Sequence, residues 1–218
     1  MFRLALIAAI LVLVSGKNVV KDCGPDDAYI KFHKLDITPM PLNILGFIKV
    51  DADIETLTRV GSEVSLSVNL KKSNLGNSFT WEVPCTNIGI IGDAAQGFTG
   101  YMGTCDYKGS CDFPFIKTWI ADNSCPKFFA DYNLPCQCPF PPVSFSTSTP
   151  VEIDLEQFKN LMPSWLIEGG YKVRAELKDT TNNNKLVGCL EMDIDVNARK
   201  PCPAVLKKLN ACPKDYQQ

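Results

Sequence analysis

The chain has 218 residues, of which 45% are apolar, so one domain can bury a sizeable core without help from its ten cysteines. Its 22 basic and 24 acidic side chains nearly balance, and no run of basic residues is longer than two, which argues against a nucleic-acid partner. GxSxG, HExxH, P-loop and GxGxxG motifs are absent from the sequence. A single histidine, His33, is the only residue able to serve a Ser-His or Cys-His mechanism.

The N-terminal segment has the order of a secretory signal peptide. Arg3 precedes an apolar run over residues 4–14, and Ser15 and Gly16 are small residues that suit cleavage. The run is too short to span a membrane. We therefore expect residues 1–16 to be a signal peptide and the mature chain, starting near Lys17, to be secreted or luminal.

All ten cysteines follow this segment. In an oxidising compartment an even number of cysteines predicts five disulfides and no free thiol. A zinc site is the competing interpretation, but a single histidine argues against a mixed Cys/His site. We expect neither a metal nor a cofactor.

Alternation of apolar and polar residues with a period of two predicts half-buried strands. In chain order the alternating stretches are 64–70, 79–83, 171–177 and 190–196. The residues 180–185, TTNNNK, predict a hairpin turn between the last two strands. Because no convincing helical period precedes residue 200, the predicted fold class is all-β, an antiparallel sandwich.

The middle of the chain departs from this alternation. Six cysteines between Cys85 and Cys138 predict an irregular segment held by disulfides rather than by strand pairing. Within it, the glycine-rich residues 89–103 are expected to form a surface loop. In LPCQCPF, Cys136 and Cys138 point to the same side of an extended stretch, and a bond between them would close a strained ring. Each is therefore expected to bond a different cysteine.

Bulky apolar residues occur where the pattern predicts loops. One cluster is WLI at residues 165–167, between Pro163 and a glycine pair, and another is FPFIKTWI at residues 113–120. Such side chains either fold back onto the core or contact a hydrophobic ligand or a membrane surface. Two clusters in loops favour the second alternative.

Six motifs follow one another in the order and near-spacing of a known family: WEVPCTN, CDYKGSC, SCP, YNLPCQCPF, PSWLIEGGYKV and LVGCLEMDI. Over residues 79–194 the chain resembles the ganglioside activators, the lysosomal sphingolipid activators of the ML-type lipid-recognition superfamily. The LPC-x-CPF and PSWL-x-x-G-x-Y elements are the distinctive ones. The stretch of 19 residues between Cys85 and Cys105 is longer than is usual in that family.

The resemblance implies a fold and a set of disulfides. The fold is an antiparallel β-cup, a sandwich open at one end over a large apolar cavity, with a disulfide-stapled rim loop. The cup would span residues 17–197, followed by a C-terminal appendage at 198–218 that could include a short helix. The implied disulfides are Cys23–Cys189, Cys85–Cys105, Cys111–Cys138 and Cys125–Cys136, which leaves Cys202 and Cys212 to pair by elimination.

The resemblance also implies a function without catalysis. We expect a protein that extracts a glycosphingolipid or a phospholipid from a membrane and carries or presents it, with a transient membrane contact and a lysosomal glycosidase, such as a hexosaminidase, as a partner. The residues expected at the lipid- and membrane-contacting rim are Trp81, Trp119, Ile120, Pro163, Trp165, Leu166 and Ile167. The alternatives are a secreted lipid hydrolase with unrecognised catalytic residues and a disulfide-rich extracellular recognition domain.

Overall fold

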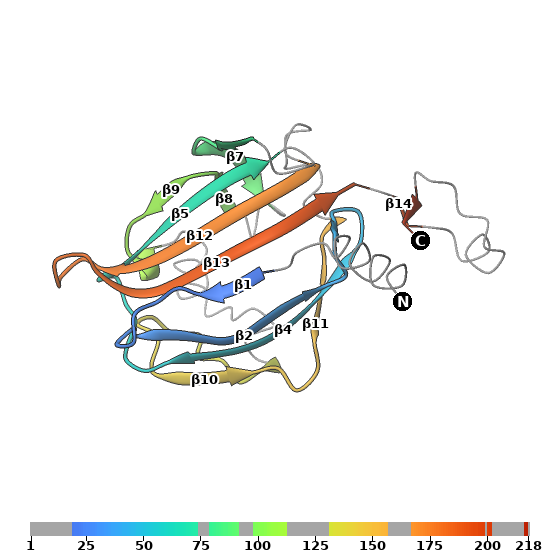
Figure 1. Ribbon diagram of the computed structural model, residues 1–218. Helices are drawn as coiled ribbons and strands as arrows, with labels where there is room; N and C mark the ends of the chain where they lie inside the picture. Colours follow the sequence, from blue (N-terminus) through green and yellow to red (C-terminus); the bar gives the residue numbers. More distant parts are fainter. Residues whose placement is uncertain are drawn as a thin grey trace, which may run out of the picture.

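The computed structural model describes residues 19–73, 79–91, 98–112, 131–156, 167–198, 200–201 and 216–217. The regular elements named among these residues are strands and a 3₁₀ turn at Ser110–Asp112, joined by turns and loops. Two sheets, antiparallel except for one short parallel pair at Leu42–Asn43 and Val196–Asn197, lie one above the other as two layers (Figure 1). The predicted all-β class is confirmed.

The larger sheet contains seven strands among the described residues. Its centre is formed by three long strands in the order β13, β12, β5, with bounds Lys185–Asn197, Gly169–Asp179 and Val64–Ser73. Each edge is shared by two short strands placed end to end. Beside β13 lie β1 (Val19–Asp22) and β3 (Leu42–Asn43), and beside β5 lie β6 (Thr80–Glu82) and β9 (Cys105–Tyr107).

The smaller sheet is built around β4 (Phe47–Thr56). β2 (Ile30–Thr38) pairs along one side of β4. β10 (Val143–Ser146) and β11 (Val151–Asp154) share the other side, one pairing with each half of the strand. A bulge in β2 at His33 shifts the register between Phe32 and Lys34.

The four predicted alternating strands are present as β5, β6, β12 and β13. Their register brings apolar residues together on one face, since residues that pair across antiparallel strands share a face. Val68, Ala175 and Leu190 form one such row across β5, β12 and β13. In the smaller sheet, an equivalent apolar row is formed by Ile37, Val50 and Val151.

The predicted hairpin after β12 is also confirmed. The backbone N–H of Asn182 donates to the carbonyl of Asp179, and the N–H of Lys185 donates to the carbonyl of Asn182. Asn183 and Asn184 both have a φ of 54°, a left-handed conformation that asparagine tolerates better than most residues. The run of three asparagines therefore provides residues that tolerate the backbone conformation of this turn.

The expected loop at residues 89–103 is wrong at residues 89–91 and 98–102, which form strands, and residues 92–97 lie outside the described residues. β7 (Thr86–Ile91) and β8 (Phe98–Met102) pair as an antiparallel ribbon. Gly89 lies opposite Gly100, and the isoleucine, threonine and phenylalanine residues around them favour extended backbone. The segment between Cys85 and Cys138 is therefore held partly by strand pairing, at β7, β8 and β9.

Hydrogen bonds of one carboxylate tie the two sheets together at the end of β1. The Asp22 carboxylate accepts hydrogen bonds from the backbone N–H groups of Gly24 and Phe32, at 2.7 and 2.9 Å. Because Asp22 ends β1 and Phe32 lies in β2, one side chain bridges the larger and the smaller sheet. Next to it, Cys23 is bonded to Cys189 of β13.

At the C-terminus, β14 (Lys200–Pro201) and β15 (Tyr216–Gln217) form a short parallel pair. The helix expected between Cys202 and Cys212 lies outside the described residues.

Candidate functional site

The space between the sheets is filled with side chains at one end. Val60, Val64 and Val187 are buried there. Tyr29, Ile30, Phe140 and Leu177 pack against them. This end lies beside the β12–β13 hairpin, where β5 begins and β12 ends, so the interior is closed on this side.

At the other end of the same strands the interior is hollow. A pocket of about 270 Å³ opens between the sheets. The residues that line it are Leu42, Ile44, Ile48, Leu70, Met102, Leu155, Tyr171, Val173, Ile194 and Val196. They come from the end of β5, the start of β12, the end of β13 and, from the smaller sheet, the start of β4, so both layers contribute walls.

Inward-facing side chains confirm that the sheets do not close on each other over their whole length. In the row formed by Val68, Ala175 and Leu190, the first two are only half-buried although they face the interior. Val50 and Ile54 of β4 are half-buried as well. A packed sandwich core would bury such positions almost completely, so the arrangement is that of a cup.

One inward-facing row at the hollow end holds a charged residue. Across four strands the row reads Ile194, Tyr171, Lys72, Trp81. Lys72 is only 6% exposed, and its Nζ lies 5.5 Å from the centre of the Tyr171 ring. Burial lowers the pKa of Lys72, while the charge of Glu168 acts in the opposite direction. Burial also raises the pKa of Tyr171 to about 12, so its phenol stays protonated.

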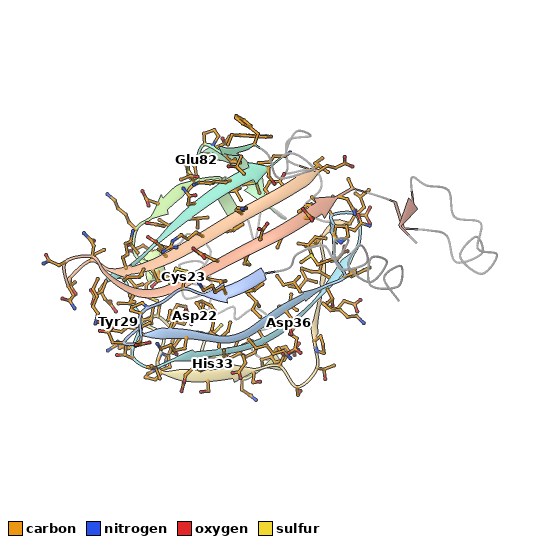
Figure 2. All side chains as sticks on the ribbon, in the orientation of Figure 1. Asp22, Cys23, Tyr29, His33, Asp36 and Glu82 are labelled. Carbon is orange, nitrogen blue, oxygen red and sulfur yellow. A yellow bond between two sulfur atoms is a disulfide. The ribbon has the colours of Figure 1, made fainter. Side chains whose placement is uncertain are left out.

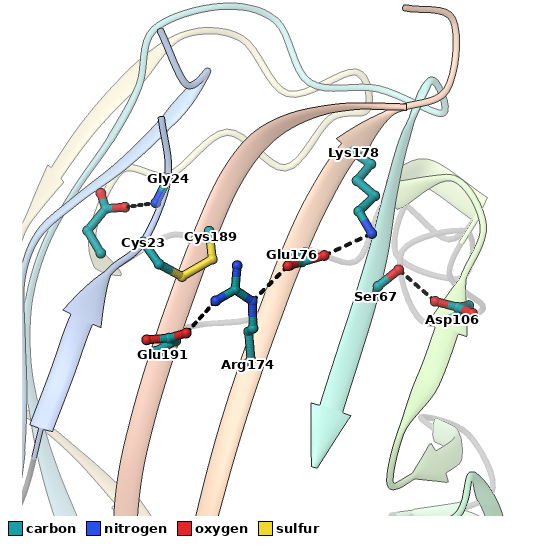
Figure 3. A network of polar contacts seen from close by, with 10 residues as sticks. Cys23, Gly24, Ser67, Asp106, Arg174, Glu176, Lys178, Cys189 and Glu191 are labelled. Atoms are coloured by element: carbon teal, nitrogen blue, oxygen red, sulfur yellow. Dashed lines mark hydrogen bonds and ion pairs between the residues drawn. A yellow bond between two sulfur atoms is a disulfide. The ribbon is translucent and has the colours of Figure 1, made fainter. Parts of the chain in front are cut away.

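The outer face of the larger sheet is polar by contrast. Arg174 donates to Glu176 at 2.7 Å and also to Glu191, and Lys178 pairs with Glu176 at 2.8 Å (Figure 3). These charges alternate along the strands with the inward apolar residues. Hydrophobic surface is therefore directed into the pocket.

His33 does not belong to the pocket. Its ring nitrogen lies within hydrogen-bond distance, 3.2 Å, of the Glu55 carboxylate at the protein surface, at the bulge of β2 (Figure 2). The half-exposed side chain is absent from the pocket lining. A hydrolase that used this histidine would not act on a ligand held between the sheets.

Two of the seven predicted rim residues fall in the described part of the chain. Trp81 lies on the edge strand β6, on the same inward face as Lys72, and is half-buried. Ile167 is half-buried and lies just before β12. Trp119, Ile120, Pro163, Trp165 and Leu166 lie outside the described residues.

Phe79 is an exposed aromatic residue beside Trp81 that the set of predicted rim residues does not include. It is 65% exposed, and its ring centre lies 6.2 Å from that of Trp81. In the alternation of residues 79–83 it reads as an inward strand position, and only its place before the start of β6 leaves it exposed.

The described disulfides follow the pairs implied by the resemblance. Cys23 is bonded to Cys189, Cys85 to Cys105 and Cys111 to Cys138. Cys136 is disulfide-bonded too, to a cysteine outside the described residues. Neighbouring Cys136 and Cys138 thus have different partners, as the strained-ring argument predicts. Cys125, Cys202 and Cys212 lie outside the described residues.

Within the described ranges, no group of three His, Cys, Asp or Glu side chains comes together in a way that could hold a metal ion. No helix in these ranges is long and apolar enough to cross a membrane.

Comparison with known proteins gives relatives over most of the chain. A family model described as ML domain matches residues 17–196. A protein named ganglioside GM2 activator from Mus musculus is 29% identical over 181 residues, covering 82% of this chain and 80% of that protein. The protein of the same name from Macaca fascicularis is 30% identical over 174 residues, covering 78% and 77%. Among solved structures, a Niemann-Pick type C2 protein from Japanese carpenter ant matches with a TM-score of 0.35 and 13% identity, over 82% of this chain and 99% of that one.

Proposed function

The chain belongs to the ML-domain family, and from that premise we propose that it is a non-enzymatic protein that takes up a lipid and carries or presents it. The observation that carries the proposal is the pocket of about 270 Å³ between the two sheets, because its lining is apolar and comes from both layers. Such a pocket suits acyl chains, with the polar head of the lipid left at the open end.

The energetics of extraction explain why an interior pocket is needed. Moving a methylene from hydrocarbon into water costs about 0.8 kcal/mol, so an exposed chain of about 18 carbons costs roughly 14 kcal/mol. Contacts to a head group alone do not offset that cost. The chain therefore has to pass from the bilayer into an interior of comparable polarity.

The chemistry of the pocket argues against catalysis there. Of its ten lining residues only Tyr171 carries a titratable group, and a phenol with a pKa of about 12 supplies neither a nucleophile nor a base at neutral pH. His33 lies at the protein surface in contact with Glu55. A lipid hydrolase is therefore the weaker candidate.

The ligand class and the partners belong to the same proposal. The relatives are named ganglioside activators, which supports a glycosphingolipid ligand and a glycosidase as the enzyme partner. A membrane surface is the source of the lipid, and the predicted rim residues, Trp165 among them, would enter its interface. The signal-like residues 1–16 support delivery to the cell exterior or the lysosomal lumen.

The first test is mass spectrometry of an organic extract of the purified protein, combined with uptake of added lipid. We expect about one lipid per chain in one of the two measurements. No stoichiometric lipid in the extract and no uptake would overturn the proposal in favour of a recognition domain. Release of free fatty acid or free sugar from the added lipid would favour a hydrolase.

A matched pair of variants links uptake to the pocket. Val173 faces the pocket, and its neighbour Lys172 on the same strand faces solvent, with its side chain 52% exposed. Val173→Trp should fill the hollow and reduce lipid uptake about tenfold or more, whereas Lys172→Trp should leave uptake unchanged. Equal uptake by the two variants would show that lipid binds elsewhere.

A further inference from the structure

The inward face of β5 changes character at its last inward position. Val64, Leu66, Val68 and Leu70 are apolar and alternate along the strand, and the next residue on that face is Lys72. Its neighbours across the sheet are Tyr171 on β12 and Trp81 on β6. A lysine therefore interrupts a row of otherwise apolar and aromatic side chains, one step nearer the strand end than the pocket residue Leu70.

The Tyr171 ring and the charge of Glu168 offset part of the free-energy cost of a lysine at this position. Its residue surface is only 6% exposed, and a desolvated ammonium costs free energy that an apolar residue of the same length would avoid. The adjacent outward position, Lys71, carries an exposed lysine at no such cost. A buried cation at the margin of an apolar pocket is the kind of group that is retained for binding.

The geometry matches the layout of a lipid in the cup. Acyl chains held between Leu70, Val173 and Ile194 would leave the head group toward the end of β5 and the start of β6. Lys72 lies at that level, and its ammonium sits 5.5 Å from the ring of Tyr171, which itself lines the pocket. The Lys72 charge is thus next to the place where the head group meets the pocket.

We propose that Lys72 is a specificity-determining residue that binds the anionic group of the lipid ligand, a sulfate, phosphate or carboxylate, at the open end of the cup. This inference rests on the proposed lipid-binding function and adds the charge of the head group to it. Because this ion pair forms in a site shielded from water, it is stronger than the same ion pair at an exposed lysine.

The test compares two lipids with the same ceramide, galactosylceramide and its 3-sulfate. We expect wild-type protein to bind the sulfated lipid about tenfold more tightly or better, the range of a charge-assisted hydrogen bond. Lys72→Met, which keeps the length of the side chain, should bring the two affinities within about twofold while keeping the affinity for galactosylceramide. Lys71→Met, one residue away on the outer face, should keep the wild-type preference.

Every other outcome overturns either the role of Lys72 alone or the proposed lipid binding as well. Equal wild-type affinities, or a preference that survives in Lys72→Met, would remove Lys72 as the anion site and leave lipid binding standing. Binding of neither lipid by wild-type protein would remove the proposed function, and this inference with it. The wild-type comparison does not depend on how a variant folds. Millimolar sodium sulfate should leave the preference intact, and competition at that concentration would identify a site for free anions instead.

Discussion

Asp179 shows how a single carboxylate stabilises the closed end of the cup. It ends β12, is almost fully buried, and accepts hydrogen bonds from the Thr181 hydroxyl at 2.7 Å and the Thr181 N–H at 2.9 Å. Across the interior, the Tyr29 hydroxyl donates to it at 3.1 Å. The hydrogen bonds from Thr181 are the main reason why the pKa of Asp179 is lowered from 3.8.

The sign of this shift predicts a pH dependence. A carboxyl with a lower pKa in the folded state stabilises the fold above its unfolded pKa, and the contribution is lost as the pH falls through the folded pKa. Asp179→Asn should therefore lower the free energy of unfolding at pH 7, with a difference from wild type that shrinks below about pH 4. Urea unfolding from pH 7 to about pH 2.5 measures this. Asp26→Asn, at an exposed position, is the control, and a pH-independent difference for Asp179→Asn would contradict the argument.

Sequence patterns predict the position of some single residues in the fold and miss others. The alternation that places Val64 to Leu70 on one face extends to Lys72, but a lysine at the end of a strand reads as a solvated terminus. Only the pairing with Tyr171 and Trp81 reveals that it faces inward. The bulge at His33 is likewise set by the pairing of β2 with β4 and has no signal of its own in the sequence.

At the scale of the element, the strands of the larger sheet are the predictable ones. β5 and β12 alternate strongly between valine, leucine or tyrosine and polar residues, and β13 alternates over its second half. β4 alternates too, but its outward face is acidic and one of its inward residues is the small Ala52, and such residues individually disfavour strands. Of the smaller sheet, the sequence therefore indicates only the strand-like stretch around His33, which is β2, while the fold class as a whole is predictable.

Gly103 allows the β7–β8 ribbon to rejoin the larger sheet. Its φ is +119°, and a Cβ at this position would collide with the carbonyl oxygen of Pro84, which belongs to the bridge between Pro84 and Thr104. Gly103→Ala should therefore destabilise the protein by about 2–4 kcal/mol in chemical unfolding, from a strained backbone and a clash with main-chain atoms. Gly46→Ala is the control, because the nearest atom to a Cβ there lies at 3.4 Å. Equal stability of the two variants would contradict this role for Gly103.

At the scale of the whole molecule, the disulfides set how much chain is constrained. Cys23 and Cys189 are separated by 166 positions, against 20 for Cys85 and Cys105. In the chain-entropy description, removing the disulfide that closes the longer loop lowers the free energy of unfolding by about 2 kcal/mol more than removing the one that closes the shorter loop. Cys23→Ala/Cys189→Ala should therefore have a lower free energy of unfolding than Cys85→Ala/Cys105→Ala, measured in guanidinium. The reverse order would indicate that native packing, rather than chain entropy, dominates.

The pairing of the cysteines is a feature that sequence patterns predict only in part. Composition predicts that the cysteines bond, and local geometry predicts that Cys136 and Cys138 do not bond each other. The partners themselves come from the family resemblance, since eight cysteines allow about 105 connectivities. The pocket is also a property of the whole molecule: alternation fixes which residues face inward, and only the separation of the two sheets decides whether they pack or leave a hollow.

The charge of the whole protein predicts how it meets a membrane. The sequence pI is about 5.5, so the protein is weakly anionic at neutral pH and cationic at about pH 4.5, where many carboxylates are protonated and the lysines and arginines keep their charge. Hydrogen bonds and ion pairs lower the pKa of Asp27, Asp51 and Glu176, so these groups stay ionised longer and move the reversal toward lower pH. Attraction to anionic lipid is therefore expected to appear on acidification.

We accordingly expect binding to anionic vesicles to be stronger at about pH 4.5 than at pH 7 and to weaken with added salt, since surface charges are screened. Trp165→Ala should weaken binding at both pH values, because it removes apolar insertion and leaves the net charge unchanged. Leu57→Ala is the matched control: Leu57 is an exposed apolar residue, 52% accessible, beside Tyr29 at the closed end of the cup. Vesicle co-sedimentation at two pH values and two salt concentrations separates the contribution of charge from that of apolar insertion. Equal wild-type binding at both pH values would remove the charge argument, and unaltered binding by Trp165→Ala would take Trp165 off the rim.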